Sequence, residues 1–394
     1  MKARRANILV LTGDWGDGHT QAAQALQQTA TASFSHHAQV QIVDILQLFS
    51  PRLHALCKTL FLRLIRTCPR LYTFLYERTR NESRWSRIFE PFSLMSSHKI
   101  KDLIDALEPD LIVCTFPLAA ATVSRLKQNQ LIDQPVFTII TDHTCHTYWL
   151  HACTDHYIVA STDIRSDMIR SGLEPRQITA AGIPVKPSFL QQYDRMELAR
   201  KHACQPERTT LLWMGGGYGM MGDDMLALIG QIIREYDVQI IIVCGRNQKL
   251  WKQCRKRFHH QPAITCTGYV EHIHELMAIS DFIITKAGGL TTAEAMSQTL
   301  PMVLYRPLPG QEEENAHYFV ERGCAWLSRH PEQLLRQIEI LIQSPSARAA
   351  IRANIRLLHN QKAAFTALQT MLNVHVQARQ TDETAHPTSL LLTP

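Results

Sequence analysis

Long apolar runs are absent from the sequence, and charged residues are few. No run approaches the roughly eighteen uninterrupted apolar residues of a membrane-spanning helix, and even the aliphatic stretch 238–244 contains Gln239. Charged residues make up 19% of the chain and hydrophobic ones 45%, a balance that excludes a disordered protein. The sequence therefore predicts a soluble or peripheral protein, and its 394 residues suit two domains.

Paired cysteine motifs and an N-terminal leader are also absent. The ten cysteines are scattered and form no CxxC pair, which is typical of reduced thiols in a cytoplasmic protein. The basic N-terminus is followed by an apolar run of residues 8–11 only, which is too short for a signal peptide. We therefore expect a cytoplasmic protein.

Short β-branched and aliphatic runs recur along the chain, each followed by a turn and a helical pattern. This alternation predicts parallel sheets covered by helices on both faces, and hence an α/β fold. The predicted strands are residues 7–11, 40–43, 111–114, 136–140, 156–159, 210–214, 238–243, 282–285 and 301–304.

Two of these strands lead into glycine-rich turns, at residues 13–18 and 215–219. Each turn would begin a doubly wound, Rossmann-like half, and the two prolines at positions 184 and 187 mark the join between the halves. We predict one domain at residues 1–185, a second at 186–375 that includes the final helix, and a disordered tail at 376–394. The two domains would face each other across a cleft.

The glycines at 215–219 expose backbone N–H groups between a strand and a helix, which suits a phosphate. A tight turn that binds no ligand would explain the same glycine-rich sequence equally well. The loop matches neither GxxxxGK[ST] nor GxGxxG, so an ATPase and a dehydrogenase lose support.

Glu294 has two interpretations. Thr291-x-x-Glu294 has the spacing of a capping box, in which the carboxylate bonds to the backbone at a helix start. Alternatively, Glu294 points into the cleft, where a carboxylate accepts two hydrogen bonds from a ribose diol. Spacing alone favours the cap.

The polar stretch 307–315 follows the predicted strand 301–304. Ligands of open parallel sheets bind at the carboxyl edge of the strands, and amide and carboxylate side chains suit sugar hydroxyls. On composition alone, however, a solvated acidic turn is the simpler interpretation.

Histidine, cysteine and aspartate are crowded into residues 141–156. His143 and His146 are three apart, but the segment matches no established zinc spacing and lacks HExxH, so we do not predict a metal site. In the first glycine-rich turn, Asp14 or His19 could act as a base, although either could instead cap the following helix.

The segment 52–101 is strongly basic, with 11 Lys+Arg against three acids. Leucine and aromatic side chains are interleaved with the cations, which favours an anionic membrane surface over a nucleic acid. Each surface cation near anionic lipid contributes about 1 kcal/mol. A solvated helical face is the alternative.

The order of the motifs resembles one family. The motifs are residues 12–19 (TGDWGDGH), 141–143 (TDH), 214–217 (MGGG), 244–247 (CGRN), 268–270 (GYV), 285–295 (TKAGGLTTAEA) and 309–315 (PGQEEEN). Over residues 6–375 this set resembles the diacylglycerol glycosyltransferases, namely the bacterial processive diacylglycerol glucosyltransferases and the plant monogalactosyldiacylglycerol synthases. The lipid II N-acetylglucosaminyltransferase is a more distant likeness.

The resemblance implies a GT-B fold with a lipid acceptor in the first domain and a UDP-sugar in the second. It implies that Glu294 holds the ribose, that Gln311 and Glu312 hold the hexose, and that backbone near Tyr269 and Val270 reads uracil. Backbone amides would stabilise the diphosphate without a metal or other cofactor. The predicted donor-binding residues are Gly215, Gly216, Gly217, Arg246, Tyr269, Val270, Gly288, Gly289, Leu290, Thr291, Glu294, Gln311 and Glu312.

The resemblance also supplies catalytic and acceptor candidates. Asp14 matches the base proposed for the plant relatives and His19 matches a histidine of the wider family, so both stay as candidates. The residues predicted to contact the acceptor or the membrane are Gly18, His146, Trp149, Arg63, Arg66 and Arg70.

The function implied by the resemblance is inverting transfer of glucose or galactose from a UDP-sugar to diacylglycerol, on the cytoplasmic face of a membrane. Three alternatives stay open. The enzyme could transfer N-acetylglucosamine to a polyprenyl-linked or other lipid, the chain could be a catalytically silent relative that binds lipid or nucleotide, or it could be a metal hydrolase built on the segment near His146. We expect no nucleic-acid partner, and the sequence does not predict an oligomeric state.

Overall fold

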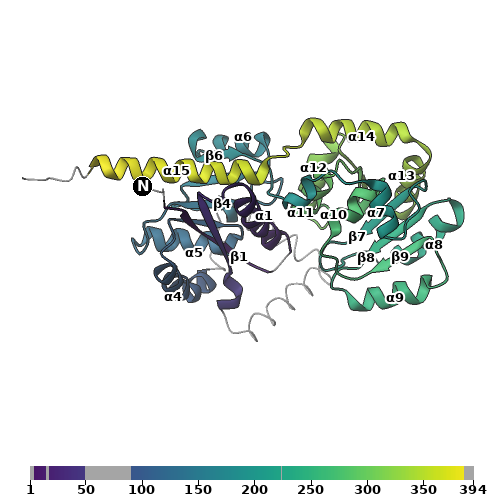
Figure 1. Cartoon of the computed structure of the whole chain (residues 1–394), viewed down its shortest axis with the longest axis horizontal. Helices are drawn as coiled ribbons and strands as arrows, with labels where there is room; N and C mark the ends of the chain where they lie inside the picture. Colours follow the sequence, from purple (N-terminus) through teal and green to yellow (C-terminus); the bar gives the residue numbers. More distant parts are fainter. Residues whose placement is uncertain (1–3, 15–16, 49–89, 223, 386–394) are drawn as a thin grey trace, which may run out of the picture.

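The computed structural model describes residues 4–14, 17–48, 90–222 and 224–385. They form two lobes, each built on a six-stranded parallel sheet with helices on its faces (Figure 1). The predicted α/β class with two doubly wound halves is confirmed.

The first sheet has the strand order β2-β1-β3-β4-β5-β6. Its strands are β1 (Ala6–Thr12), β2 (Ala38–Asp44), β3 (Leu111–Cys114), β4 (Val136–Ile139), β5 (His156–Val159) and β6 (Ile178–Ala180). Its chain also forms helices α1 (Asp17–Ser33), α4 (Glu90–Leu107), α5 (Pro117–Gln128) and α6 (Thr162–Arg170), and the 3-10 helices η1 (Ile45–Leu48), η3 (Thr147–Trp149) and η4 (Pro175–Gln177). Because helices cover both faces, every residue of β3, β4 and β5 is buried.

The second sheet has the order β12-β11-β10-β7-β8-β9. Its strands are β7 (Thr210–Met214), β8 (Gln239–Val243), β9 (Ile264–Thr267), β10 (Phe282–Thr285), β11 (Met302–Tyr305) and β12 (Ala325–Ser328). The helices of this part of the chain are η5 (Pro187–Leu190), α7 (Arg195–Lys201), α8 (Met225–Glu235), α9 (Gln248–Phe258), α10 (Ile273–Ile279), α11 (Gly289–Ser297), α12 (Gln311–Glu321), α13 (Pro331–Gln343) and α14 (Pro345–Leu358).

The strands that the sequence did not predict are β6, β9 and β12. All three lie at the edges of their sheets. An edge strand needs fewer apolar residues than a central one, and β9 reads Ile-Thr-Cys-Thr with only its first residue buried. The rule that detects continuous apolar runs therefore finds central strands and misses these.

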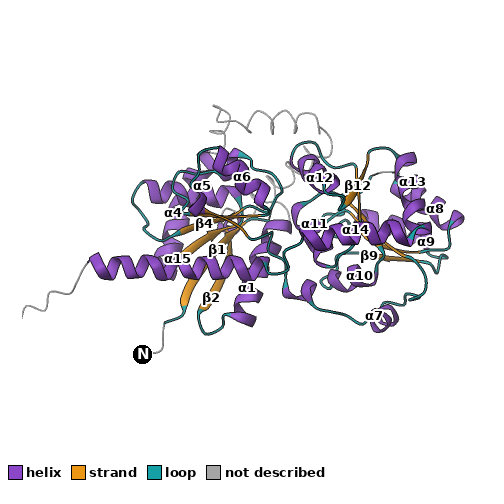
Figure 2. Ribbon diagram, turned by 90° about the horizontal axis from the view of Figure 1, so that it is seen from above, coloured by secondary structure: helices purple, strands orange, loops and turns teal. Residues whose placement is uncertain are grey.

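The final helix differs from the prediction. α15 (Ala363–Ala385) leaves the second lobe and packs against α1 of the first, where Ala367, Leu368 and Met371 join the core cluster that includes Ile8 and Val10. Figure 2 shows α1 and α15 on one face of the first sheet and α4, α5 and α6 on the other. α15 also continues as a helix to Ala385, through residues expected to be disordered.

The structure describes only part of the basic segment 52–101. Residues 52–89 of the predicted membrane-docking segment, including Arg63, Arg66 and Arg70, lie outside the described residues, and α4 begins at Glu90. Within the described ranges, no helix combines the length and apolarity needed to cross a membrane.

The packing of α15 predicts a stability effect in the first lobe. Leu368 is fully buried (0% exposed), so Leu368→Ala leaves a cavity and should lower the free energy of unfolding by about 2–5 kcal/mol. Leu357 on α14 is 87% exposed, and Leu357→Ala is the matched control, expected to change it by less than about 0.5 kcal/mol. Urea denaturation measures both, and equal effects would contradict the packing of α15.

Candidate active site

A cleft of about 2780 Å³ lies between the two lobes and is lined by residues of both. From the first lobe it is lined by Asp14, Gly18 and His19. From the second lobe it is lined by the whole predicted donor set, namely Gly215, Gly216, Gly217, Arg246, Tyr269, Val270, Gly288, Gly289, Leu290, Thr291, Glu294, Gln311 and Glu312. Residues up to about 300 positions apart in the sequence thus share one cavity.

The second glycine-rich loop follows β7 and curls tightly. Gly216 and Gly219 have φ of +67° and +55°, and a Cβ on Gly219 would lie 1.9 Å from the carbonyl oxygen of Cys244. A side chain is therefore excluded at Gly219. As predicted, the loop lies between a strand and a helix, although α8 begins only at Met225.

One of the helix starts that face the cleft is that of α11. Gly288 is the N-cap residue of this helix and makes no side-chain cap, and Gly289 begins the helix. A Cβ on Gly289 would lie 2.0 Å from the carbonyl oxygen of Thr141 in the first lobe. Only glycine allows this approach, which leaves the free N–H groups of α11 at the cleft.

The capping-box interpretation of Glu294 is wrong. α11 starts two residues before Thr291, so Glu294 is the sixth residue of the helix and not its third. Its side chain is buried yet lines the cleft, and burial raises the pKa of Glu294 to about 8, while the charge of Lys186 lowers it. The alternative, a carboxyl group directed at a cleft ligand, fits this placement.

Gln311 and Glu312 form the first turn of α12. Glu312 accepts a hydrogen bond of 2.7 Å from the backbone N–H of Leu308, and burial raises its pKa. The interpretation of this stretch as a solvated acidic turn is therefore wrong for these two residues, which line the cleft as half-buried side chains.

Asp14 and His19 lie on the opposite wall. The Tyr218 hydroxyl, from the second lobe, donates to Asp14 Oδ1 at 3.0 Å. His19 Nδ1 lies 3.1 Å from Thr141 Oγ1. Burial lowers the pKa of His19 to about 4, so the ring is neutral near pH 7. In the tautomer with the proton on Nδ1, the Nδ1–H group donates a hydrogen bond to Thr141 Oγ1. Nε2 then keeps a lone pair that can accept a proton.

Asp17 and Arg246 connect the two walls. Arg246 Nη1 forms an ion pair with Asp17, and its guanidinium lies 4.5 Å from the centre of the Tyr269 ring. Asp17 lies so close to Gly217 that a Cβ there would be 1.5 Å from its Oδ2. The first lobe therefore places a carboxylate directly against the glycine-rich loop of the second.

Two of the predicted acceptor residues do not reach the cleft. Trp149 is fully buried (0% exposed) behind His19, with ring centres 5.8 Å apart. His146 is buried and accepts a hydrogen bond from the N–H of Tyr148. Their neighbours Tyr148, Leu150 and His151 line the cleft instead. Trp149 and His146 thus support the wall.

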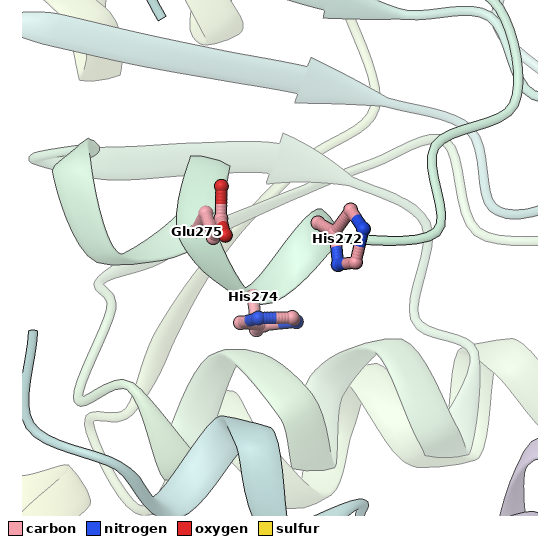
Figure 3. Close-up of side chains that lie close together, drawn as sticks. All are labelled: His272, His274 and Glu275. Carbon is pink, nitrogen blue, oxygen red and sulfur yellow. The ribbon is translucent and has the colours of Figure 1, made fainter. Parts of the chain in front are cut away.

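Among the described residues, the histidines of segment 141–156 belong to no cluster of three metal-ligating side chains. His143 stacks on Tyr318 with 4.3 Å between ring centres, and burial lowers its pKa to about 3. A different set, His272, His274 and Glu275, has ligand atoms within 4.8 Å of one another (Figure 3). Lys201 and His202 each lie 2.7 Å from a different oxygen of Glu275. Because both oxygens are already engaged, this set gives no basis for assigning a metal.

Sequence reasoning missed several charged residues of the cleft, among them Asp142 and Lys186. Asp142 lies just beyond β4 and is 2% exposed, and Lys186 lies at the join of the lobes near the charges of Glu294 and Asp17. Burial raises the pKa of Asp142 to about 6. The rule that ligands bind beyond the carboxyl ends of strands could have identified Asp142.

The fold is that of a GT-B protein, and similar solved structures share it. A crystal structure of MurG from Acinetobacter baumannii aligns with a TM-score of 0.59 and 15% identity, over 95% of this chain and 100% of that one. The Anabaena protein Alr3699/HepE in complex with UDP-glucose aligns with a TM-score of 0.56 and 14% identity, over 94% and 99%. At such identities the likeness concerns the fold alone.

Sequence comparison identifies the family. The profile of monogalactosyldiacylglycerol (MGDG) synthase matches residues 19–185, and that of the glycosyltransferase family 28 C-terminal domain matches residues 223–380. The processive diacylglycerol β-glucosyltransferases of Bacillus pumilus and Bacillus subtilis are 30% and 29% identical over 93% of this chain and 94% of their own length. The chain belongs to the diacylglycerol glycosyltransferase family, and the predicted resemblance is confirmed.

The burial of Glu294 predicts a pH-dependent stability. Between pH 4.5 and about 8 the carboxyl is ionised in the unfolded chain but protonated in the fold, so the folded state binds more protons and loses stability as pH rises. Glu294→Gln removes this loss, and its melting temperature without ligand should exceed that of the wild type by more at pH 8 than at pH 5. Thermal scans measure this. Glu321→Gln, at an exposed position, is the control, and a pH-independent difference would contradict the burial.

Proposed function

We propose that the protein transfers a hexose, glucose or galactose, from a UDP-sugar to the hydroxyl of diacylglycerol with inversion at the anomeric carbon. The observation that carries this is the meeting of two walls in one cleft: candidate bases on the first lobe, and a glycine-rich loop, a free helix start and a buried glutamate on the second. The names of the relatives support diacylglycerol as the acceptor.

The second lobe offers groups for each part of a UDP-sugar. In the proposed complex Glu294 holds the ribose hydroxyls, backbone at Tyr269 and Val270 meets the uracil, and Gln311 and Glu312 hold the hexose. The amides of residues 215–217 and the start of α11 at residues 288–289 stabilise the diphosphate, and Lys186 adds a positive charge beside them. No metal or other cofactor takes part in this scheme.

Asp17 occupies part of this region in the ligand-free structure. Its carboxylate lies against Gly217 and is paired with Arg246. A diphosphate at the glycine-rich loop would repel that carboxylate. In our proposal the donor displaces Asp17, and Arg246 then pairs with a phosphate.

The chemical step is a single displacement. A base, His19 or Asp14, takes the proton of the acceptor hydroxyl as its oxygen bonds to the anomeric carbon. The bond from that carbon to the phosphate oxygen breaks, and UDP leaves with the negative charge. Backbone amides at the loop and at α11 stabilise this charge. One displacement on the face opposite the leaving group inverts the configuration.

The acceptor determines where the reaction takes place. Diacylglycerol is held in a bilayer, so the enzyme has to work at a membrane surface. The excess of Lys and Arg in residues 52–101 supports docking to anionic lipid. We propose a peripheral enzyme on the cytoplasmic face.

Labelled UDP-hexoses and liposomes containing diacylglycerol and anionic lipid test the function. We expect a β-linked hexosyl diacylglycerol, identified by mass spectrometry and by the anomeric coupling in its NMR spectrum. Turnover should persist in the presence of EDTA. Transfer only from UDP-N-acetylglucosamine to a polyprenyl lipid, or UDP-sugar binding without any turnover, would replace this proposal with one of the alternatives.

Substitution of the two candidate bases separates their roles. The variants are His19→Ala and Asp14→Asn. Substitution of the residue that takes the proton should lower kcat by about 10²–10⁴-fold, with little change in donor affinity. The controls are His37→Ala and Asp133→Asn at exposed positions of the same lobe. Steady-state kinetics with liposomes measures the loss. If both variants keep kcat within threefold of the wild type, neither residue is the base.

A further inference from the structure

Asp142 is a buried carboxylate on the side of the cleft opposite the predicted donor residues. It follows β4 of the first lobe, is 2% exposed and lines the cleft. The side chains of Gln311 and Asn315, both on α12 of the second lobe, lie beside it. Asp142 therefore belongs to the first lobe but lies beside residues of the second lobe that are expected to hold the hexose.

The loop that carries Asp142 is fixed in place. Asn315 Oδ1 accepts from the N–H of His143 at 2.7 Å, and Asn315 Nδ2 donates to the carbonyl of Ala287 at 3.0 Å. A Cβ on Gly289 would lie 3.0 Å from Asp142 Oδ1. The carboxylate is thus wedged between the start of α11 and the start of α12.

One oxygen of this carboxylate has no hydrogen-bond partner. Among the described residues, Oδ2 of Asp142 is buried and accepts no bond. Buried polar atoms are almost always paired, because leaving one unpaired costs the desolvation of that atom. Glu312 and Glu314 add negative charge nearby. The missing partner is therefore a hydrogen-bond donor.

The parts of the two substrates differ in what they offer to this oxygen. A diphosphate carries no donor near neutral pH and would be repelled, and an acyl chain has no polar group. In our proposal the ribose faces Glu294, the uracil faces Tyr269 and the acceptor hydroxyl faces the base, which leaves the hexose for this oxygen. A sugar hydroxyl donates one hydrogen bond and accepts others. Asp142 with Gln311 and Glu312 would then surround the hexose with one donor amide and two acceptor carboxyl groups.

We propose that Asp142 Oδ2 accepts a hydrogen bond from a hydroxyl of the transferred hexose, which makes Asp142 a specificity-determining residue supplied by the acceptor-side lobe. This inference rests on the proposed function only in that the ligand is a UDP-hexose. It adds a contact that assembles only when both lobes meet around the sugar.

The test pairs a side-chain change with removal of single hydroxyls from the donor. The binding of UDP, UDP-glucose, UDP-galactose and their 3-, 4- and 6-deoxy analogues to the full-length chain is measured by calorimetry, and kcat/KM is measured with diacylglycerol liposomes. In the wild type, one deoxy analogue should have an affinity and a kcat/KM roughly 10- to 100-fold below those of the parent UDP-hexose, the range for a hydrogen bond to a charged group. In Asp142→Asn and Asp142→Ala, the same analogue should differ from the parent UDP-hexose by less than threefold.

Two controls keep the outcome decisive. UDP alone should bind both variants within twofold of the wild type, because it lacks the hexose, and Asp133→Asn should keep the wild-type preference. Equal losses for every analogue in wild type and variant, or a loss of UDP affinity in both Asp142 variants, overturns the inference. If the affinity for UDP-hexoses depends on both the hexose hydroxyl and Asp142 but no hexose is transferred to diacylglycerol, the contact is supported and the proposed reaction is refuted.

Discussion

The approach of Gly289 to the Thr141 carbonyl is the constraint on which the geometry of the cleft depends. With 2.0 Å between that oxygen and the position of a Cβ, only glycine fits. The end of β4 in one lobe therefore meets the start of α11 in the other without an intervening side chain. Asn315 strengthens this contact, since it bonds to both the segment after β4 and the segment before α11. The placement of Asp142, Glu294 and the α11 amides follows from this one contact.

Much of the fold could be predicted because central strands of parallel sheets need continuous apolar runs. The predicted limits of 111–114, 156–159, 210–214 and 282–285 coincide with those of β3, β5, β7 and β10. The partner of α15 could not be predicted in this way, because an amphipathic helix does not specify which apolar surface it covers. The lobe that receives α15 depends on the path of the chain after α14.

The candidate site could be predicted where its residues are grouped in motifs, and not where tertiary contacts decide their roles. The spacing of Thr291 and Glu294 suggested a cap, but α11 begins at Gly289 because the helix packs against the other lobe. The role that we propose for Asp142 depends on its position beside Gln311, which is remote in sequence. Trp149 is adjacent in sequence to residues that line the cleft, but its own side chain is fully buried.

The return of α15 has a consequence for motion. The chain passes between the lobes twice, near Gly182 and again near Asn360, and the Asn360 side chain donates to the carbonyl of Ala181 at 2.8 Å. A Cβ on Gly182 would lie 3.0 Å from that of Ala363, so the two passages lie side by side. Two chain passages that lie side by side restrict a twist of one lobe against the other more than a single passage would.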